Sequence, residues 1–186
     1  MKLPERLVRL FDYPVGDIVA ALPPPSSPVW DANTHRQDKH AVHRETRSII
    51  FEWTDDRWLP GQPAEVQRTD CGLPALTAAV YACAAALAAR YDGKRIRLLL
   101  ADLGPHCRIS PHKDGGAGVV MVHRLHVPVV TNEKVKFFID EIPHYLEPGV
   151  AYEFDNTRRH AVDNDSDSPR IHLMCDILPA ALVVPS

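Results

Sequence analysis

The sequence predicts a mainly β fold, a β-sandwich or barrel with helices laid against one side. From Arg95 onward, short runs rich in β-branched and aromatic residues are separated by Gly, Pro, Asn and Asp, which is typical of strands joined by turns. The strongest helical pattern, at about 73–91, precedes this series and is rich in alanine. A run of strands that follows the helices favours two packed sheets or a closed barrel.

The size of the chain suits one domain, 1–186. A hydrophobic fraction of 45% beside 24% charged residues allows a sizeable core. We expect a helical and loop segment over 1–44 and a β core over 45–178, into which the helix at about 73–91 is inserted. The formal net charge is -3 and no basic run occurs, which argues against nucleic acid or an acidic membrane surface as a partner.

The cysteines and the N-terminus bear on localisation. Four cysteines are widely spaced with no C-x-x-C pair: Cys71, Cys83, Cys107 and Cys175. This spacing argues against a structural zinc site and predicts reduced thiols in a cytoplasmic protein. The first residues show no secretory signal, and the apolar segment Leu73–Tyr91 is too short to span a bilayer, which needs about 20 apolar residues.

The first 44 residues predict short elements. Two amphipathic patterns, Pro4–Phe11 and Val15–Leu22, predict two helices, and the proline-rich stretch 23–28 predicts an exposed loop. A polar segment then carries three histidines: His35, His40 and His43. The last two could share a helical face, but no third metal ligand of suitable spacing lies nearby. We therefore expect solvated loop histidines here.

The remaining elements follow in order. The stretch Thr46–Trp53 predicts the first strand, and Pro74 suits the first turn of the helix that ends before Asp92-Gly93. Six strand-like runs come after it: Arg95–Leu103, Cys107–His112, Val119–Val130, Val135–Asp140, Val150–Asp155 and Arg170–Leu178.

A candidate metal site begins at the H-x-D pair of His112 and Asp114. Residues two apart on extended backbone point to the same face, so one strand can supply both ligands. His160 lies 46 residues after Asp114, behind a turn and a strand that could return it to the pair. Two imidazoles and one carboxylate are the ligands of non-haem Fe(II) oxygenases, which leave coordination positions open. By itself H-x-D is a weak signal, because a surface accident or a hydrogen-bonded pair explains most examples.

Arginines near this motif suggest an anion site. Arg170 follows His160 by ten residues, where a planar two-pronged ion pair could anchor 2-oxoglutarate. Arg124 and His126 share one face of a strand, which is costly in a core unless an anion meets them. They could contact a carboxylate of a cosubstrate or substrate, or form an internal salt bridge, for instance to Asp140 or Glu141.

Several motifs together resemble the aspartyl/asparaginyl β-hydroxylase family, and the chain is similar to its bacterial free-proline cis-4-hydroxylases. The motifs are Ile109-Ser110-Pro111-His112-x-Asp114, Arg124-x-His126-x-Pro128, Glu147-Pro148-Gly149 with Phe154-Asp155, His160-x-Val162-x-Asn164, and Arg170-x-His172-Leu173-x-x-Asp176. The resemblance covers roughly 45–178, and it is specific because the motifs recur in the same order.

The resemblance implies a double-stranded β-helix, the jelly-roll and cupin-like fold, with Fe(II), 2-oxoglutarate and O2 as cofactors. The activity implied is hydroxylation of an unactivated C–H bond of an amino acid, free or within a peptide, with release of succinate and CO2. By position, the iron ligands would be His112, Asp114 and His160. Arg170 would bind the distal carboxylate of 2-oxoglutarate, and Arg124 and His126 would lie beside a carboxylate of cosubstrate or substrate.

Two other functions stay open at this point: a cupin-like metalloenzyme or isomerase that does not use 2-oxoglutarate, and a non-catalytic jelly-roll binding module. The substrate is also open, because the free-proline enzymes continue beyond the point where this chain ends, eight residues after Leu178. Three tryptophans could line a pocket or belong to the core: Trp30, Trp53 and Trp58.

Overall fold

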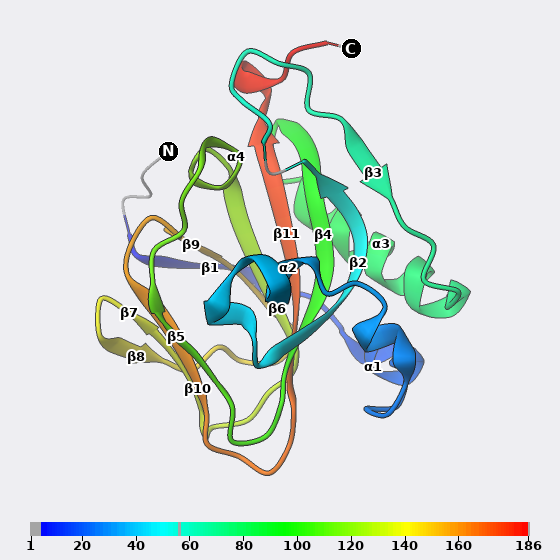
Figure 1. The fold of residues 1–186 in the computed structure, drawn as a ribbon, viewed down its shortest axis with the longest axis vertical. Coiled ribbons are helices and arrows are strands. Elements are labelled where there is room, and N and C mark those ends of the chain that lie inside the picture. Colours follow the sequence, from blue (N-terminus) through cyan, green and yellow to red (C-terminus); the bar gives the residue numbers. More distant parts are fainter. Residues whose placement is uncertain (1–4, 56, 186) are drawn as a thin grey trace.

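Two antiparallel sheets face each other in the computed structural model, which describes residues 5–55 and 57–185 (Figure 1). The larger sheet has seven strands in the order β1-β9-β6-β11-β4-β2-β3, and the smaller has four in the order β5-β10-β7-β8. The strands are β1 (Leu7–Asp12), β2 (Thr46–Thr54), β3 (Val66–Arg68), β4 (Gly93–Leu103), β5 (Arg108–His112), β6 (His123–Val130), β7 (Val135–Ile139), β8 (Ile142–His144), β9 (Val150–Phe154), β10 (His160–Asn164) and β11 (Arg170–Pro179). This is the mainly β fold that the strand pattern predicts and the jelly roll that the family resemblance implies.

The helices are short except one. They are α1 (Gly16–Ala21), α2 (His35–Lys39), α3 (Pro74–Ala88) and α4 (Ala117–Val120), with 3-10 turns η1 (Pro28–Asp31), η2 (Ala41–His43) and η3 (Ala180–Leu182). Pro74 opens α3, and its buried residues pack with Ile18 of α1 on the outer face of the larger sheet. No helix of the described residues is long and apolar enough to cross a membrane.

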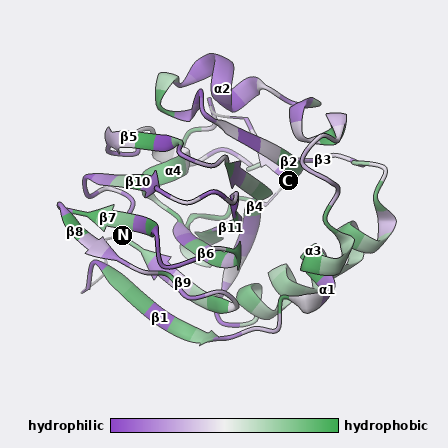
Figure 2. Cartoon of the chain, turned by 90° about the horizontal axis from the view of Figure 1, so that it is seen from below, coloured by the Kyte–Doolittle hydropathy of each residue, from purple (hydrophilic) through white to green (hydrophobic). Residues whose placement is uncertain are grey.

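The alternation of side chains along the central strands separates two environments. In β6, Leu125, Val127 and Val129 belong to the core under α1 and α3, whereas Arg124 and His126 point into the space between the sheets. Strand β11 repeats this pattern with apolar residues on the helix side. Figure 2 shows the result from below, with α1 and α3 on one side of the larger sheet and the hydrophilic α2 on the other. The period of two therefore directs polar side chains toward an interior site.

Some predicted elements differ from the structure. Residues 7–12 form strand β1 and not the helix predicted over Pro4–Phe11, of which residue 4 lies outside the described residues. The register of β1 against β9 shifts between Arg9 and Phe11, so a bulge breaks the alternation that marks a strand and leaves a helix-like spacing of apolar residues. The run Val119–Val130 begins in α4, and its strand starts at His123. The short strands β3 and β8 were not predicted.

Other predictions are confirmed. Residues 16–21 are helical, residues 23–27 lie outside helices and strands, and β2 covers the predicted first strand. All four cysteines are free thiols.

Candidate active site

Three side chains converge at the end of the smaller sheet. His112 ends β5, Asp114 follows it, and His160 begins β10, which pairs antiparallel with β5 so that the two histidines are direct partners. The ligand atoms of the three residues lie within 4.8 Å of one another. Both imidazole Nε2 atoms face Asp114 Oδ1, His112 at 3.7 Å and His160 at 3.9 Å. The structure thus brings together the H-x-D pair and the distant histidine.

Backbone carbonyls hold both imidazoles in the form that a metal requires. The Nδ1 atom of His112 donates to the carbonyl of Ser110 at 2.7 Å, and that of His160 donates to the carbonyl of Arg158 at 2.9 Å. Because a carbonyl oxygen only accepts, the proton of each neutral ring lies on Nδ1 and the lone pair lies on Nε2. The two rings are therefore oriented with their basic nitrogens toward the carboxylate of Asp114.

Asp114 is held as a carboxylate with one oxygen free for a metal. Its Oδ2 accepts from Arg124 and, at 3.0 Å, from the side-chain amide of Asn156, while Oδ1 faces the histidines. Burial by itself would raise the pKa of Asp114, but the charge of Arg124, then His160 and the bond from Asn156 hold that pKa below its usual value. The ligand is therefore ionised at neutral pH.

Arg124 joins Asp114 to a second buried carboxylate. Its Nε and Nη2 donate to the two oxygens of Asp176 at 2.9 and 2.7 Å, and its Nη1 donates to Asp114. This is the internal salt bridge that the sequence left open, although Asp140 and Glu141 pair instead with Arg158 and Arg159. A contact of Arg124 with a cosubstrate stays a prediction, whereas its role in orienting Asp114 follows from these bonds.

Replacing Asp176 by asparagine should lower metal affinity by roughly 10- to 100-fold, because Arg124 loses the charged partner that fixes it against Asp114. Competition with a chromophoric chelator would measure the affinity for Co(II) or Fe(II). The exposed Asp165→Asn variant is the matched control and should bind metal like wild type. Equal affinity in Asp176→Asn would contradict the positioning role of Arg124.

Arg170 lies deeper, in an inner cavity between the sheets. Its side chain is almost inaccessible, with 2% of the residue exposed, and it forms no ion pair with any described residue. The nearby carboxylate of Asp102 is bound by Arg47 at 2.6 Å. Burial, and then the charge of Arg36, lowers the pKa of Arg170 to about 9. An unpaired cation is costly in such a place unless a ligand brings an anion.

Two histidines border this inner cavity from the larger sheet. His126 lines the cavity and its Nδ1 lies 3.3 Å from Nδ1 of His172, while the Nε2 atoms of both rings have no partner among the described residues. Burial, and then the charge of Arg170, lowers the pKa of each ring well below its usual value, so both are neutral. The Nε2 atom of His126 is therefore a polar group without a partner beside Arg170.

An outer cavity of about 370 Å³ adjoins the inner one and reaches His112 and Asp114. Helix α2 and turn η2 line one side of it, and side chains of β4 and β11 line another. Trp53 belongs to this wall, whereas Trp30 and Trp58 are buried in the hydrophobic cores. Thus one of the three tryptophans borders the site.

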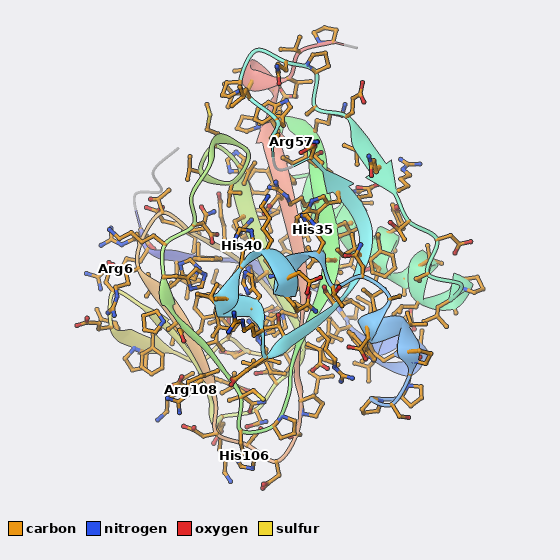
Figure 3. The ribbon with its side chains drawn as sticks, in the orientation of Figure 1. Arg6, His35, His40, Arg57, His106 and Arg108 are labelled. Carbon is orange, nitrogen blue, oxygen red and sulfur yellow. The ribbon has the colours of Figure 1, made fainter. Side chains whose placement is uncertain are left out.

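Two residues of the site, Arg36 and His43, were not predicted from the sequence. His43 is half-buried, packs edge-on against His112 at 5.8 Å between ring centroids, and has its pKa lowered to about 2 by burial and then by Arg36. The expectation of a solvated loop histidine is therefore wrong for His43. His35 and His40 are exposed on α2 and after it (Figure 3). No periodic pattern marks this segment, so only the tertiary fold reveals its role.

The chain is similar to one protein family and to several solved structures. The model of the family described as aspartyl/asparaginyl beta-hydroxylase matches residues 31–179. A solved oxidoreductase of the 2OG-Fe(II) oxygenase family from Burkholderia pseudomallei is similar with a TM-score of 0.51 and 13% identity, over 92% of this chain and 93% of that one. A cupin domain from Bordetella pertussis is similar over 47% of this chain and 86% of its own, with 20% identity and a TM-score of 0.37. No curated protein matches the sequence. The Burkholderia structure supports the fold alone.

Proposed function

The chain belongs to the aspartyl/asparaginyl β-hydroxylase family, and from this we propose that it is an Fe(II)- and 2-oxoglutarate-dependent hydroxylase of an amino acid, free or within a peptide. The observation that carries the proposal is the convergence of His112, Asp114 and His160 on a cavity that also holds the buried, unpaired Arg170. The reaction inserts one oxygen atom of O2 into a C–H bond, and the other atom appears in succinate as CO2 is released.

The residues present fit both absent groups. Two Nε2 lone pairs and Asp114 Oδ1 form the 2-His-1-carboxylate set that suits Fe(II) and leaves positions for other ligands. Arg170 offers a charged, buried donor whose Nε has no partner among the described residues, and His126 Nε2 is likewise unsatisfied. A dicarboxylate such as 2-oxoglutarate would satisfy a cation that the protein leaves unpaired.

The chain's own residues then have distinct tasks. His112, His160 and Asp114 would hold the metal, and the carbonyls of Ser110 and Arg158 keep the two rings in place. Arg170 would orient the distal carboxylate of the cosubstrate. When bound, the iron and 2-oxoglutarate supply the oxidising power for the C–H bond by activating O2. The aromatic walls of Phe137 and Phe154 exclude water from the inner cavity.

We also propose that residues 1–186 act as one domain in which the first 44 residues complete the catalytic core. Strand β1 extends the larger sheet beside β9, and α2 lines the outer cavity. The described part of the segment 1–44 thus contributes to the site as well as to the fold, and 45–178 supplies the metal ligands and Arg170.

A cupin-like metalloenzyme without 2-oxoglutarate explains less, because it gives Arg170 no anion. A non-catalytic binding module gives no reason for the two fixed imidazole tautomers. The test is a screen of free amino acids and short peptides, with mass spectrometry for added oxygen and a parallel assay for succinate. The proposal expects one class of compound to gain oxygen with an equal amount of succinate. Oxygen gain that does not depend on 2-oxoglutarate would contradict it.

A further inference from the structure

Arg36 is the second buried guanidinium of the site that lacks an anion. Only 7% of the residue is exposed, and no carboxylate of the described residues forms an ion pair with it. Its Nη2 lies 3.4 Å from Nε2 of His43, and its Nη1 has no partner among the described residues. Burial, and then the charge of Arg124, lowers the pKa of Arg36 to about 10. Keeping such a group inside the protein is costly unless a ligand pairs with it.

The position of Arg36 differs from that of Arg170. Arg170 lines the inner cavity but not the outer one, whereas Arg36 lines both cavities. The metal ligands His112 and Asp114 also border both. Helix α2, which carries Arg36, lies over the middle of the molecule in Figures 1 and 3, with His35 and His40 at its outer surface. A group bound to Arg36 would therefore lie between the metal and the opening.

The balance of charge in the site indicates that Arg170 and Arg36 bind different ligands. With iron and 2-oxoglutarate in place, the charges of the metal, Asp114, the cosubstrate and Arg170 cancel. Arg124 is matched by Asp176, which Arg97 also reaches at 3.4 Å. The charge of Arg36, which lines both cavities, is then left without a counter-ion. The site around Arg36 therefore suits a substrate that brings a carboxylate.

We propose that Arg36 binds a carboxylate of the primary substrate and positions it over the metal, so that the substrate is a small molecule with a free carboxylate, such as a free amino acid. The inference rests on the proposed function and adds to it a specificity-determining residue. A volume of about 370 Å³ has room for such a molecule. The rigid fork of a guanidinium matches a carboxylate by two parallel hydrogen bonds.

The experiment compares carboxylates with their amides. Anaerobic Fe(II) protein saturated with 2-oxoglutarate is titrated with free L-amino acids and with the matching carboxamides, and binding is followed by the perturbation of the visible charge-transfer band. The wild-type protein should bind one or more carboxylates roughly 10- to 100-fold more tightly than the amides. Arg36→Gln should remove this preference without weakening the binding of 2-oxoglutarate, and Arg36→Lys should retain part of the preference. The exposed Arg44→Gln variant is the control and should behave like wild type.

Several outcomes would overturn the assignment. The preference for carboxylates could be absent from the wild-type protein, or it could survive in Arg36→Gln. Alternatively, Arg36→Gln could weaken the binding of 2-oxoglutarate, which would make Arg36 a cosubstrate ligand.

A wild-type protein with no charge-transfer band would show that the proposed function fails, and a metal-free test then decides the role of Arg36. Succinate should raise the melting temperature of metal-free Arg170→Met protein through Arg36 and should have no effect on the Arg170→Met/Arg36→Gln protein. Equal stabilisation of both proteins would overturn the anion site.

Discussion

Replacing His160 by alanine should abolish hydroxylation, because the site loses one of three metal ligands and the remaining pair cannot hold the ion. Changing a residue that only supports a ligand typically lowers metal affinity by about 10- to 100-fold, so removing the ligand itself should exceed that range. The ring of His160 is buried between β5 and β7 with its Nδ1 bonded to the carbonyl of Arg158. Elemental analysis after desalting and the rate of succinate formation would measure both losses.

The control for this variant is His106→Ala. His106 is an exposed histidine that pairs with Asp167 at the surface, at the lower end of the molecule in Figure 3. It should retain wild-type metal content and turnover. Circular dichroism and urea unfolding would show that His160→Ala is folded. A folded His160→Ala protein that still binds iron and hydroxylates its substrate would contradict the assignment of the metal ligands.

Replacing Arg170 by methionine should lower the affinity for 2-oxoglutarate by about 10- to 100-fold or more, because the buried, charge-assisted pair between the guanidinium and the carboxylate of 2-oxoglutarate is lost. The same change should raise the free energy of unfolding of the ligand-free protein by roughly 1–3 kcal/mol, since an unpaired guanidinium leaves the interior and an apolar chain of similar length replaces it. A residue that costs stability and improves ligand binding is a functional residue.

Arg124→Met provides the contrast. Arg124 is also a buried arginine, but it forms ion pairs with Asp114 and Asp176. Its removal leaves two carboxylates without a cation and should destabilise the protein by about 3–5 kcal/mol. Urea unfolding of both variants, together with the KM for 2-oxoglutarate, separates the roles. An Arg170→Met protein that is destabilised like Arg124→Met and has an unchanged KM would contradict the anion site.

Sequence patterns predicted those parts of the molecule that depend on neighbouring residues. The period of two in β6 predicted that Arg124 and His126 would share one face of the strand, and both side chains line the cavity between the sheets. The spacing of His112 and Asp114 placed two ligands at one strand end, and the turn before β9 predicted a return toward them. These patterns work because strand geometry fixes the direction of successive side chains.

Other features depended on contacts between distant segments. The apolar spacing of residues 7–11 resembles a helix, but pairing with β9 and a bulge make it a strand. The partners of Arg124 could not be chosen among the acidic residues, because Asp176 lies 52 residues away and meets it only through the pairing of β6 with β11. Arg36 and His43 lie in a polar segment without periodicity, and they reach the site only because α2 and η2 cover its opening.

The most direct test of the central claim is the titration of anaerobic Fe(II) protein with 2-oxoglutarate while the visible metal-to-ligand charge-transfer band is recorded. The proposed site predicts a band in the wild-type protein that is absent from His160→Ala and requires much more 2-oxoglutarate in Arg170→Met. Iron that binds tightly to wild type without any band on addition of 2-oxoglutarate would contradict the claim and favour a metal site with a different chemistry.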